Sequence, residues 1–157
     1  MIKNEVCVVG LGYIGLPIAA LMASKGISVH GCDINATAVD TINSGLAHIQ
    51  EPGLNEAVSY AVESGFLSAS AKPRTADVFI IAVPTPYDHK FNCGDISFVK
   101  AAINSIAPVI TADSLVVIES TCPVGTTSKM ALLLGELRPD LKIASQNSTE
   151  FDVSVAY

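Results

Sequence analysis

The chain has 157 residues, of which 50% are hydrophobic and 15% charged, enough to bury the core of one domain. Nine basic and fifteen acidic residues give a formal charge of -6, and no Lys or Arg cluster forms a surface for the phosphates of nucleic acid. The four cysteines lie far apart with no Cys-x-x-Cys pair, which indicates neither a zinc site nor a disulfide framework and favours the reducing cytoplasm.

The first predicted element is a strand at residues 6–9, an apolar run that ends at glycine, as in a parallel strand buried on both faces. The uncharged stretch at residues 6–23 approaches the length of a membrane span, but its glycines and its proline would weaken a spanning helix. Glu5 also argues against a signal peptide, so we predict a strand, a tight turn and a helix. The helix should bury Ile14, Ile18, Leu21 and Met22, and Gly26 should end it.

The next segments continue this alternation of strands and helices. A second strand is predicted at residues 27–32, and Asn35 is placed to cap a short helix after it. Residues 51–53 read Glu-Pro-Gly and should open a further, strongly periodic helix. A weak strand is expected at residues 67–69 and a strong one at residues 78–83.

A polar loop is predicted at residues 84–92, and Asp95 should cap the helix that follows it. The apolar face of this helix is expected to be Phe98, Val99, Ala102, Ile103 and Ile106. A strand at residues 115–118 then leads into a turn at residues 119–125.

The last part of the chain repeats the pattern once more. A helix should bury Met130, Leu133, Leu134 and Leu137, a short strand is expected at residues 141–144, and a final strand at residues 153–157. The spacing of the strands requires crossover connections, which predicts a doubly wound, mostly parallel sheet with helices on both faces. We therefore expect a single Rossmann-type α/β domain over residues 1–157.

From Gly10 the chain reads Gly-Leu-Gly-Tyr-Ile-Gly, which is the G-x-G-x-x-G pattern between a strand and a helix. Backbone N–H groups at the start of that helix would face a pyrophosphate, and the helix dipole would favour its charge. Gly12 would allow close approach of the phosphate, and Gly15 would allow the helix to pack on the strand. Tyr13 and Ile14 would add backbone N–H groups and apolar cover. A glycine turn that only packs within an α/β fold is the alternative.

An acidic residue at the end of the second strand completes this fingerprint. Asp33 follows the glycine motif by the expected interval, and its carboxylate can accept hydrogen bonds from both hydroxyls of an adenosine ribose. The same carboxylate would repel a 2'-phosphate, and no Lys or Arg occurs between Asp33 and Lys72 to neutralise one. The sequence therefore favours NAD over NADP as the cofactor.

Several segments resemble the UDP-glucose/GDP-mannose dehydrogenase family, and together they cover the whole chain. Residues 9–17 and 33–35 are similar to the start of that family. Residues 48–54 resemble its E-P-x-L segment, residues 83–86 its V-P-T-P loop, and residues 119–126 its E-S-T-x-P-V-G-T turn.

The resemblance implies an NAD-dependent enzyme that oxidises the C6 alcohol of a UDP-sugar to a carboxylate, with two NAD and a cysteine that holds the aldehyde as a thiohemiacetal. Residues 137–141 look most similar to bacterial members that act on UDP-N-acetyl-D-mannosamine, in polysaccharide biosynthesis. In this family the cysteine, an assisting lysine and the sugar-binding residues belong to middle and C-terminal domains, which would follow Tyr157. The chain alone is therefore expected to bind NAD without turnover, and the full-length enzyme to be a cytoplasmic homo-oligomer.

The resemblance also assigns roles to residues of the two later loops. Val83, Pro84 and Thr85 should line the adenosine and pyrophosphate side of the cleft, and Ser120 and Thr121 should lie near the nicotinamide. Thr121 is the candidate catalytic residue of this chain, because its hydroxyl would orient a water or the nicotinamide. The alternative is that it caps the helix that follows.

Other reactive residues have simpler interpretations. Glu150 imitates a glutamate motif of the family but is expected to be a solvated loop residue, and Cys122 should fill space beside Pro123. The three histidines show no spacing typical of metal ligands, and we interpret them as structural or exposed: His30, His48 and His89.

Two other functions are compatible with parts of the sequence. Residues 10–17 are also similar to the start of 3-hydroxyacid dehydrogenases, whose NAD(P)-binding domain would be the second enzymatic reading. A regulatory NAD-sensing domain, of the kind attached to potassium transport systems, is the alternative outside enzymology. The segments at residues 83–86 and 119–126 favour the nucleotide-sugar dehydrogenases over both.

Overall fold

The computed structural model describes residues 5–89, 92–144 and 149–157 of the chain. Six strands form one sheet in which every pairing is parallel, in the order β3-β2-β1-β4-β7-β8. The strands are β1 (Glu5–Val9), β2 (Ser28–Cys32), β3 (Leu67–Ser70), β4 (Val78–Ile81), β7 (Leu115–Ile118) and β8 (Ser154–Ala156). The strand order reverses between β1 and β4, which is where doubly wound sheets bind ligands at the carboxyl ends of their strands.

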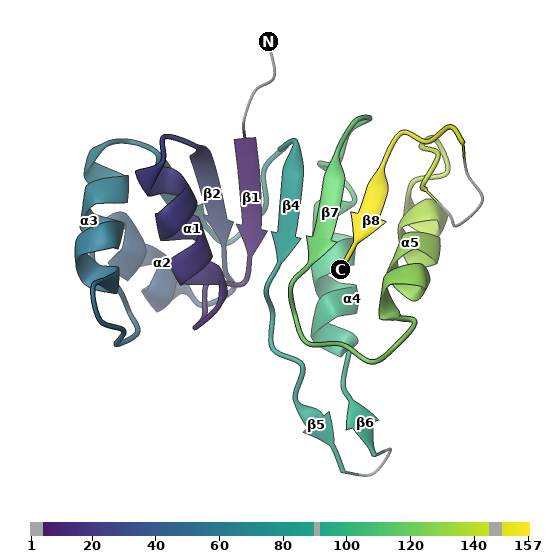
Figure 1. Cartoon of the computed structure of the whole chain (residues 1–157), viewed down its shortest axis with the longest axis horizontal. Helices are drawn as coiled ribbons and strands as arrows, with labels where there is room; N and C mark the ends of the chain where they lie inside the picture. Colours follow the sequence, from purple (N-terminus) through teal and green to yellow (C-terminus); the bar gives the residue numbers. More distant parts are fainter. Residues whose placement is uncertain (1–4, 90–91, 145–148) are drawn as a thin grey trace.

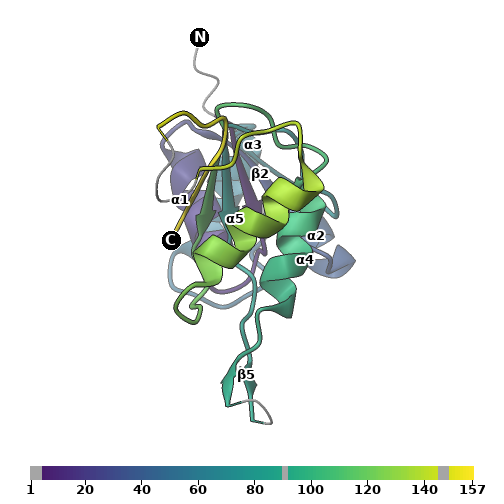
Figure 2. The same cartoon turned by 90° about the vertical axis from the view of Figure 1, so that its right-hand side faces the viewer.

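Five helices cover the two faces of this sheet (Figures 1 and 2). They are α1 (Gly15–Ser24), α2 (Ala36–Asn43), α3 (Leu54–Glu63), α4 (Ser97–Ile106) and α5 (Thr126–Leu137). Alternate residues of β1 enter separate cores, since Val8 packs with α1, α2 and α3 while Cys7 packs with α4 and α5. The predicted doubly wound α/β architecture is therefore confirmed, as is the Asn35 cap of α2, which accepts the Ala38 N–H at 3.2 Å.

The buried face of α1 differs from the predicted one. The helix buries its small side chains and Leu16. Ile18 and Met22 pack partly buried against the same core, as predicted. Ile14 and Leu21, by contrast, are 55% and 60% exposed. The residues that pack on the sheet and on α3 are Leu16, Ala19, Ala20 and Ala23. Alanine side chains let a helix backbone approach the sheet closely, and a helix that is apolar on all sides carries no periodic signal to show which side is inside.

The segment predicted as a polar loop after β4 contains a small antiparallel hairpin instead. Its strands are β5 (Tyr87–Asp88) and β6 (Cys93–Gly94), and it stands beyond the carboxyl ends of the sheet strands (Figure 2). The Asp95 N–H donates to the Pro86 carbonyl at 2.8 Å and closes the base of the hairpin. Two-residue strands are too short to show the alternation from which a strand is predicted.

The start of α4 also differs from the prediction in detail. Asp95 lies just before the N-cap residue Ile96, and its carboxylate accepts the Ser97 N–H at 2.8 Å and the Ser97 hydroxyl at 2.9 Å. These two hydrogen bonds hold the pKa of Asp95 below its usual value. The acidic side chain thus stabilises the first turn of α4 from one position earlier than predicted.

The connection between α5 and β8 holds less strand than expected. The predicted strand at residues 141–144 is reduced to a single bridge between Ile143 and Val153, while the final strand is confirmed as β8. The Asp152 carboxylate accepts the Lys142 N–H at 2.8 Å, so this N–H is not available for pairing with a neighbouring strand. Glu150 is exposed in this connection, 3.7 Å from the Lys142 ammonium, as predicted for a solvated loop residue.

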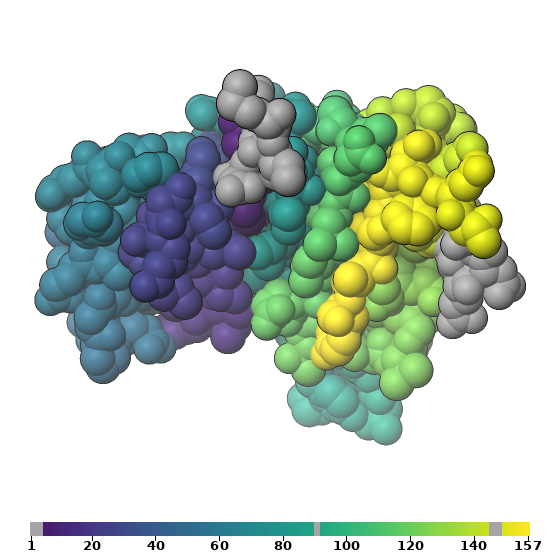
Figure 3. Space-filling view, turned by 45° about the horizontal axis from the view of Figure 1, so that its top comes forward, coloured from purple at the N-terminus to yellow at the C-terminus, as the bar shows by residue number. Residues whose placement is uncertain are grey.

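One half of the sheet is covered by helices on one face only. Figure 1 shows α4 behind β7 and α5 beside β8, and no described helix in front of β4, β7 and β8. In the space-filling view, β7 and β8 run side by side along this surface (Figure 3). Leu115 and Val117 point to this side and are half-buried, whereas the alternate residues of β7 are buried on the side of the helices.

Arg138 joins the end of α5 to the end of α4. Its guanidinium donates to the carbonyls of Ala107 and Ile110 at 2.9 and 2.7 Å, and to both carboxylate oxygens of Asp140 at 2.8 and 2.7 Å. The carbonyls at a helix end have no partner within the helix, so the planar guanidinium satisfies them. Its hydrogen bonds also hold the pKa of Asp140 below the usual carboxyl value.

We predict that Arg138→Lys lowers the melting temperature about as much as Arg138→Gln. An ammonium keeps the charge but cannot form the planar fork that reaches two carbonyls and a carboxylate together. Thermal unfolding of the three proteins checks this. The pairing with ionised Asp140 contributes above the ordinary carboxyl pKa of 3.8 and is lost as the pH falls through the lowered value, so the differences should shrink in acid. A fully stable Arg138→Lys protein would show that charge alone suffices.

Candidate functional site

The glycine turn between β1 and α1 is too tight for side chains at two of its positions. Gly10 has φ +92°, and a Cβ there would lie 2.5 Å from the Ala82 carbonyl oxygen. A Cβ at Gly15 would lie 1.8 Å from the Gly10 carbonyl oxygen. At Gly12, by contrast, a Cβ would meet no atom within 4 Å. The first and last glycines therefore let the turn close, while Gly12 leaves space on the side where a ligand would bind.

Asp33 ties this turn to the neighbouring strand. One carboxylate oxygen accepts the Leu11 N–H at 2.8 Å, and the other accepts the Asn35 N–H at 2.9 Å. Leu11 is fully buried against β2, where a Cβ at Gly31 would lie 2.7 Å from its side chain. Each carboxylate oxygen can accept a further hydrogen bond, so Asp33 can hold the turn and also receive ribose hydroxyls.

A cleft of about 530 Å³ opens beside the glycine turn, at the carboxyl ends of β1, β2 and β4. Most of the predicted cofactor-binding residues line it: Gly10, Gly12, Tyr13, Ile14, Asp33, Val83 and Pro84. No side chain caps the N-terminus of α1, so its first N–H groups remain available beside the cleft. The sequence-based placement of these residues around one cleft agrees with the structure.

The opposite wall of the cleft comes from α4, a role that was not predicted from the sequence. Phe98 was predicted to be in the core but is 43% exposed and faces the cleft. The lining residues of α4 recur at helical spacing: Phe98, Ala101, Ala102 and Ser105. This second face at i, i+3, i+4 and i+7 is the signal that could have identified the wall.

Cys32 also lines the cleft, but its chemistry is that of a buried thiol. Burial raises the pKa of Cys32 to about 12, and that of Cys7, on the adjacent strand, to about 11. Both side chains are therefore neutral thiols at physiological pH. They pack in the sheet and are not poised as nucleophiles.

The remaining predicted residues are not among those that line the cleft, although some of them contact lining residues. Gly15 lies under the turn, as described above. The buried Ser120 hydroxyl donates to the Val83 carbonyl at 2.7 Å and lies 3.2 Å from the Ile81 carbonyl. The Thr85 hydroxyl donates to the Thr121 carbonyl at 2.7 Å. These hydroxyls join the loop after β4 to the loop after β7.

Thr121 and Cys122 follow this contact at the carboxyl end of β7. The Thr121 side chain is exposed, and the N-cap of α5 is Gly125, with φ +85° and no side-chain cap. The helix-capping alternative for Thr121 is therefore wrong. Cys122 is half-buried against the core beneath α4 and α5, where burial raises the pKa of its thiol, which fits its predicted space-filling role.

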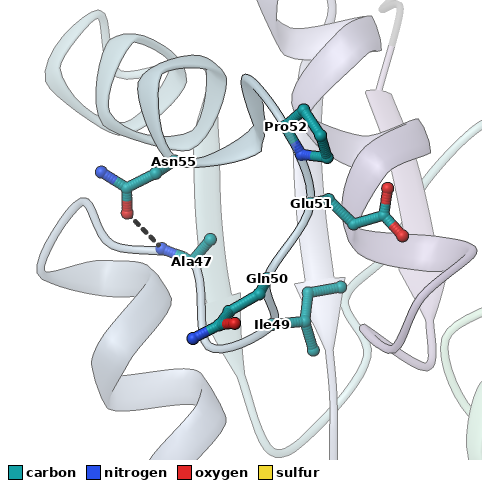
Figure 4. Close-up of a pocket in the computed structure, with 6 residues that line it drawn as sticks. All are labelled: Ala47, Ile49, Gln50, Glu51, Pro52 and Asn55. Carbon is teal, nitrogen blue, oxygen red and sulfur yellow. Dashed lines mark hydrogen bonds between the residues drawn. The ribbon is translucent and has the colours of Figure 1, made fainter.

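A second hollow, of about 430 Å³, lies at the connection between α2 and α3 (Figure 4). It is lined by Ala47, Ile49, Gln50, Glu51, Pro52 and Asn55. The Asn55 side-chain oxygen accepts the Ala47 N–H at 3.1 Å, whereas the Glu51 carboxylate points the other way in Figure 4. This hydrogen bond attaches the connection to the first turn of α3. The segment that resembles E-P-x-L therefore leads into the start of that helix.

The histidines occupy separate places in the fold. His30 hydrogen-bonds Ser68 and Ser70 of β3 at 3.2 and 2.9 Å, and burial lowers its pKa. His89 packs edge-on against Tyr87, with ring centroids 5.0 Å apart. Within residues 5–89, 92–144 and 149–157, no group of three or more His, Cys, Asp or Glu is placed to hold a metal, and no helix is long and apolar enough to cross a membrane.

Comparison with known proteins agrees with this geometry. The profile of the UDP-glucose/GDP-mannose dehydrogenase family, NAD binding domain, matches residues 4–157. The chain belongs to this family. Its cofactor is NAD, and the open Gly12 position, the uncapped α1 and the Asp33 carboxylate suit the diphosphate and ribose of that dinucleotide.

Related proteins of this family are longer than the chain. The UDP-N-acetyl-D-mannosamine dehydrogenase of Yersinia pestis is 51% identical over 156 residues, which are 98% of this chain and 36% of that protein. An NDP-N-acetyl-D-galactosaminuronic acid dehydrogenase of Ralstonia nicotianae is 50% identical over 98% of the chain and 36% of its own length. The chain thus spans about a third of these relatives.

Solved structures show the same fold. The UDP-N-acetyl-mannosamine dehydrogenase Cap5O from Staphylococcus aureus has a TM-score of 0.85 and 36% identity, over 97% of this chain and 36% of that one. A 3-hydroxyisobutyrate dehydrogenase from Salmonella typhimurium has a TM-score of 0.52 and 20% identity, over 85% of this chain and 38% of that one, and shares the fold alone. The family match therefore favours the nucleotide-sugar reading over the 3-hydroxyacid alternative.

We predict that Asp33→Asn lowers both the stability of the chain and its affinity for NAD. An amide has one oxygen, so either the Leu11 or the Asn35 N–H loses its acceptor, at a cost of about 1–2 kcal/mol. Urea denaturation and calorimetric titration with NAD measure the two effects. Asp40→Asn, on the exposed side of α2, is the matched control and should change neither.

Proposed function

We propose that the chain is the NAD-binding part of an enzyme that oxidises the C6 alcohol of a UDP-sugar to the carboxylate, with UDP-N-acetyl-D-mannosamine as the substrate. The observation that carries this proposal is the glycine turn, held by Asp33 at the head of the cleft. The name of the Yersinia pestis relative supports the sugar, while the equally similar Ralstonia nicotianae relative is named for a different one. An assay must therefore compare both sugars.

Bound NAD supplies the acceptor for the hydride that leaves the sugar C6. The chain's own part is to hold the diphosphate and the adenosine ribose of the dinucleotide. The N–H groups at the start of α1, beside Gly12, would bind the diphosphate, and Asp33 would accept the ribose hydroxyls. Thr121, exposed after β7, is the proposed catalytic residue, with its hydroxyl orienting a water or the nicotinamide.

The chain's own thiols support the view that the catalytic cysteine lies elsewhere in the enzyme. Cys7 and Cys32 are buried with strongly raised pKa values, and burial also raises the pKa of Cys122. Cys93 is exposed on the hairpin, away from the residues that line the cleft. All four are unpaired, which supports our proposal of a reducing, cytoplasmic location.

The proposal predicts that the purified chain binds NAD and does not oxidise a UDP-sugar. The chain should bind NADP at least about tenfold more weakly than NAD, because the Asp33 carboxylate repels a 2'-phosphate. Calorimetric titration with both dinucleotides measures this selectivity. NADH absorbance, followed with UDP-N-acetyl-D-mannosamine and with UDP-N-acetyl-D-galactosamine, should not rise. Turnover by the chain alone would contradict the proposal.

Gly12→Ala separates cofactor binding from folding. A Cβ at Gly12 meets no protein atom within 4 Å but occupies the side where the diphosphate would lie, so NAD affinity should fall about tenfold or more with little change in melting temperature. Gly15→Ala is the contrasting variant, because its Cβ would lie 1.8 Å from the Gly10 carbonyl oxygen and should destabilise the fold itself. Unchanged NAD affinity in Gly12→Ala would place the diphosphate elsewhere.

A further inference from the structure

Two side-chain hydroxyl groups connect the loop after β4 with the loop after β7. One hydroxyl comes from each loop, so the two hydrogen bonds run in opposite directions. Ser120, from the later loop, donates to the Val83 carbonyl at 2.7 Å, and Thr85, from the earlier loop, donates to the Thr121 carbonyl at 2.7 Å. Each loop therefore donates one hydrogen bond from a side-chain hydroxyl and accepts one at a main-chain carbonyl. We call this pair of hydrogen bonds, made by Ser120 and Thr85, the hydroxyl clasp.

The clasp reaches the cleft through Val83. This residue lines the cleft, and its Cγ1 lies 3.1 Å from the position that a Cβ of Gly10 would take. Val83 therefore rests against the first glycine of the turn whose N–H groups would bind the diphosphate. Because its carbonyl is held by Ser120, a shift of the later loop would move Val83 relative to that turn.

Ser120 itself is poorly placed to touch a ligand. Ser120 is 7% exposed and is not among the residues that line the cleft. A hydroxyl has a single proton to donate, and this one is directed at the carbonyls of Val83 and Ile81. Any effect of Ser120 on the cofactor must therefore pass through the loop that it holds.

We propose that Ser120 and Thr85 are positioning residues that hold Val83 and Pro84 against the diphosphate half of NAD, and that Ser120 makes no contact with the dinucleotide. This role differs from the direct contact near the nicotinamide that the sequence suggests for Ser120. The inference rests on the proposed function, because it requires NAD in the cleft beside the glycine turn.

Three nucleotides of decreasing length test the clasp. Calorimetric titrations would use NAD, ADP-ribose, which lacks the nicotinamide, and AMP, which lacks the second phosphate. Ser120→Ala should lower the affinities for NAD and ADP-ribose by a similar factor, about threefold to tenfold for one lost hydrogen bond, and leave the affinity for AMP unchanged. A direct contact with the nicotinamide would weaken NAD alone, and that result would overturn the proposal.

Ser114 provides a matched control at the other end of the same strand. It is buried just before β7, and its hydroxyl donates to the Ala76 carbonyl at 3.2 Å, remote from the residues that line the cleft. Ser114→Ala should reduce stability without changing the affinity for any of the three nucleotides. An equal loss of ADP-ribose affinity in Ser114→Ala would overturn the proposal, because the effect would then be general destabilisation.

Thr85 supplies a second variant that does not disturb a buried position. Thr85→Val should lower the affinity for ADP-ribose, and Thr85→Ser should restore it. In the double variant Thr85→Val, Ser120→Ala the fold-loss of this affinity should be smaller than the product of the two single fold-losses, because both hydrogen bonds join the same loops. If Ser120→Ala fails to fold, the Thr85 pair decides the question. Unchanged ADP-ribose affinity in Thr85→Val would then overturn the clasp, whereas wild-type protein that bound none of the nucleotides would overturn the proposed function itself.

Discussion

The hydrogen bond from the Leu11 N–H to the Asp33 carboxylate is the contact on which the cofactor site depends. It joins the turn after β1 to the end of β2, and the buried Leu11 side chain adds a second attachment over Gly31. Because the carboxylate fixes the turn, the N–H groups at the start of α1 have a defined direction before any ligand arrives. Binding then orders less of the protein, so less of the interaction free energy is lost.

The charge of the cleft gives this preorganisation its importance. The chain carries a formal charge of -6, and no Lys or Arg is among the residues that line the cleft. Attraction for a diphosphate must therefore come from backbone N–H groups and the dipole of α1, whose effect falls off within the first turn. Such short-range donors act only when the turn and Val83 keep their positions. The close packing around Gly10 and Gly15 serves that purpose.

The packing of α1 on the sheet is also close. Its alanines bring the helix close to the sheet, and its larger side chains Ile14 and Leu21 lie outside. Beneath the other face, α4 supplies both a core side and the cleft wall that contains Phe98. One helix thus separates the hydrophobic core from the ligand cleft, which explains why an apolar residue of α4 can be exposed without disturbing the fold.

The sequence by itself determined the order of strands and helices along the chain and the Rossmann-type sheet, because apolar runs, glycines and caps are local signals. It also placed residues near Gly12 and Asp33 around one cleft. It did not determine which side of α1 is buried, the hairpin around Tyr87, or the face of α4 at Phe98. Those depend on which elements meet across the sheet. Only the tertiary structure decided that the Ser120 hydroxyl turns toward Val83, since a side chain's partner on a distant loop leaves no trace in the neighbouring sequence.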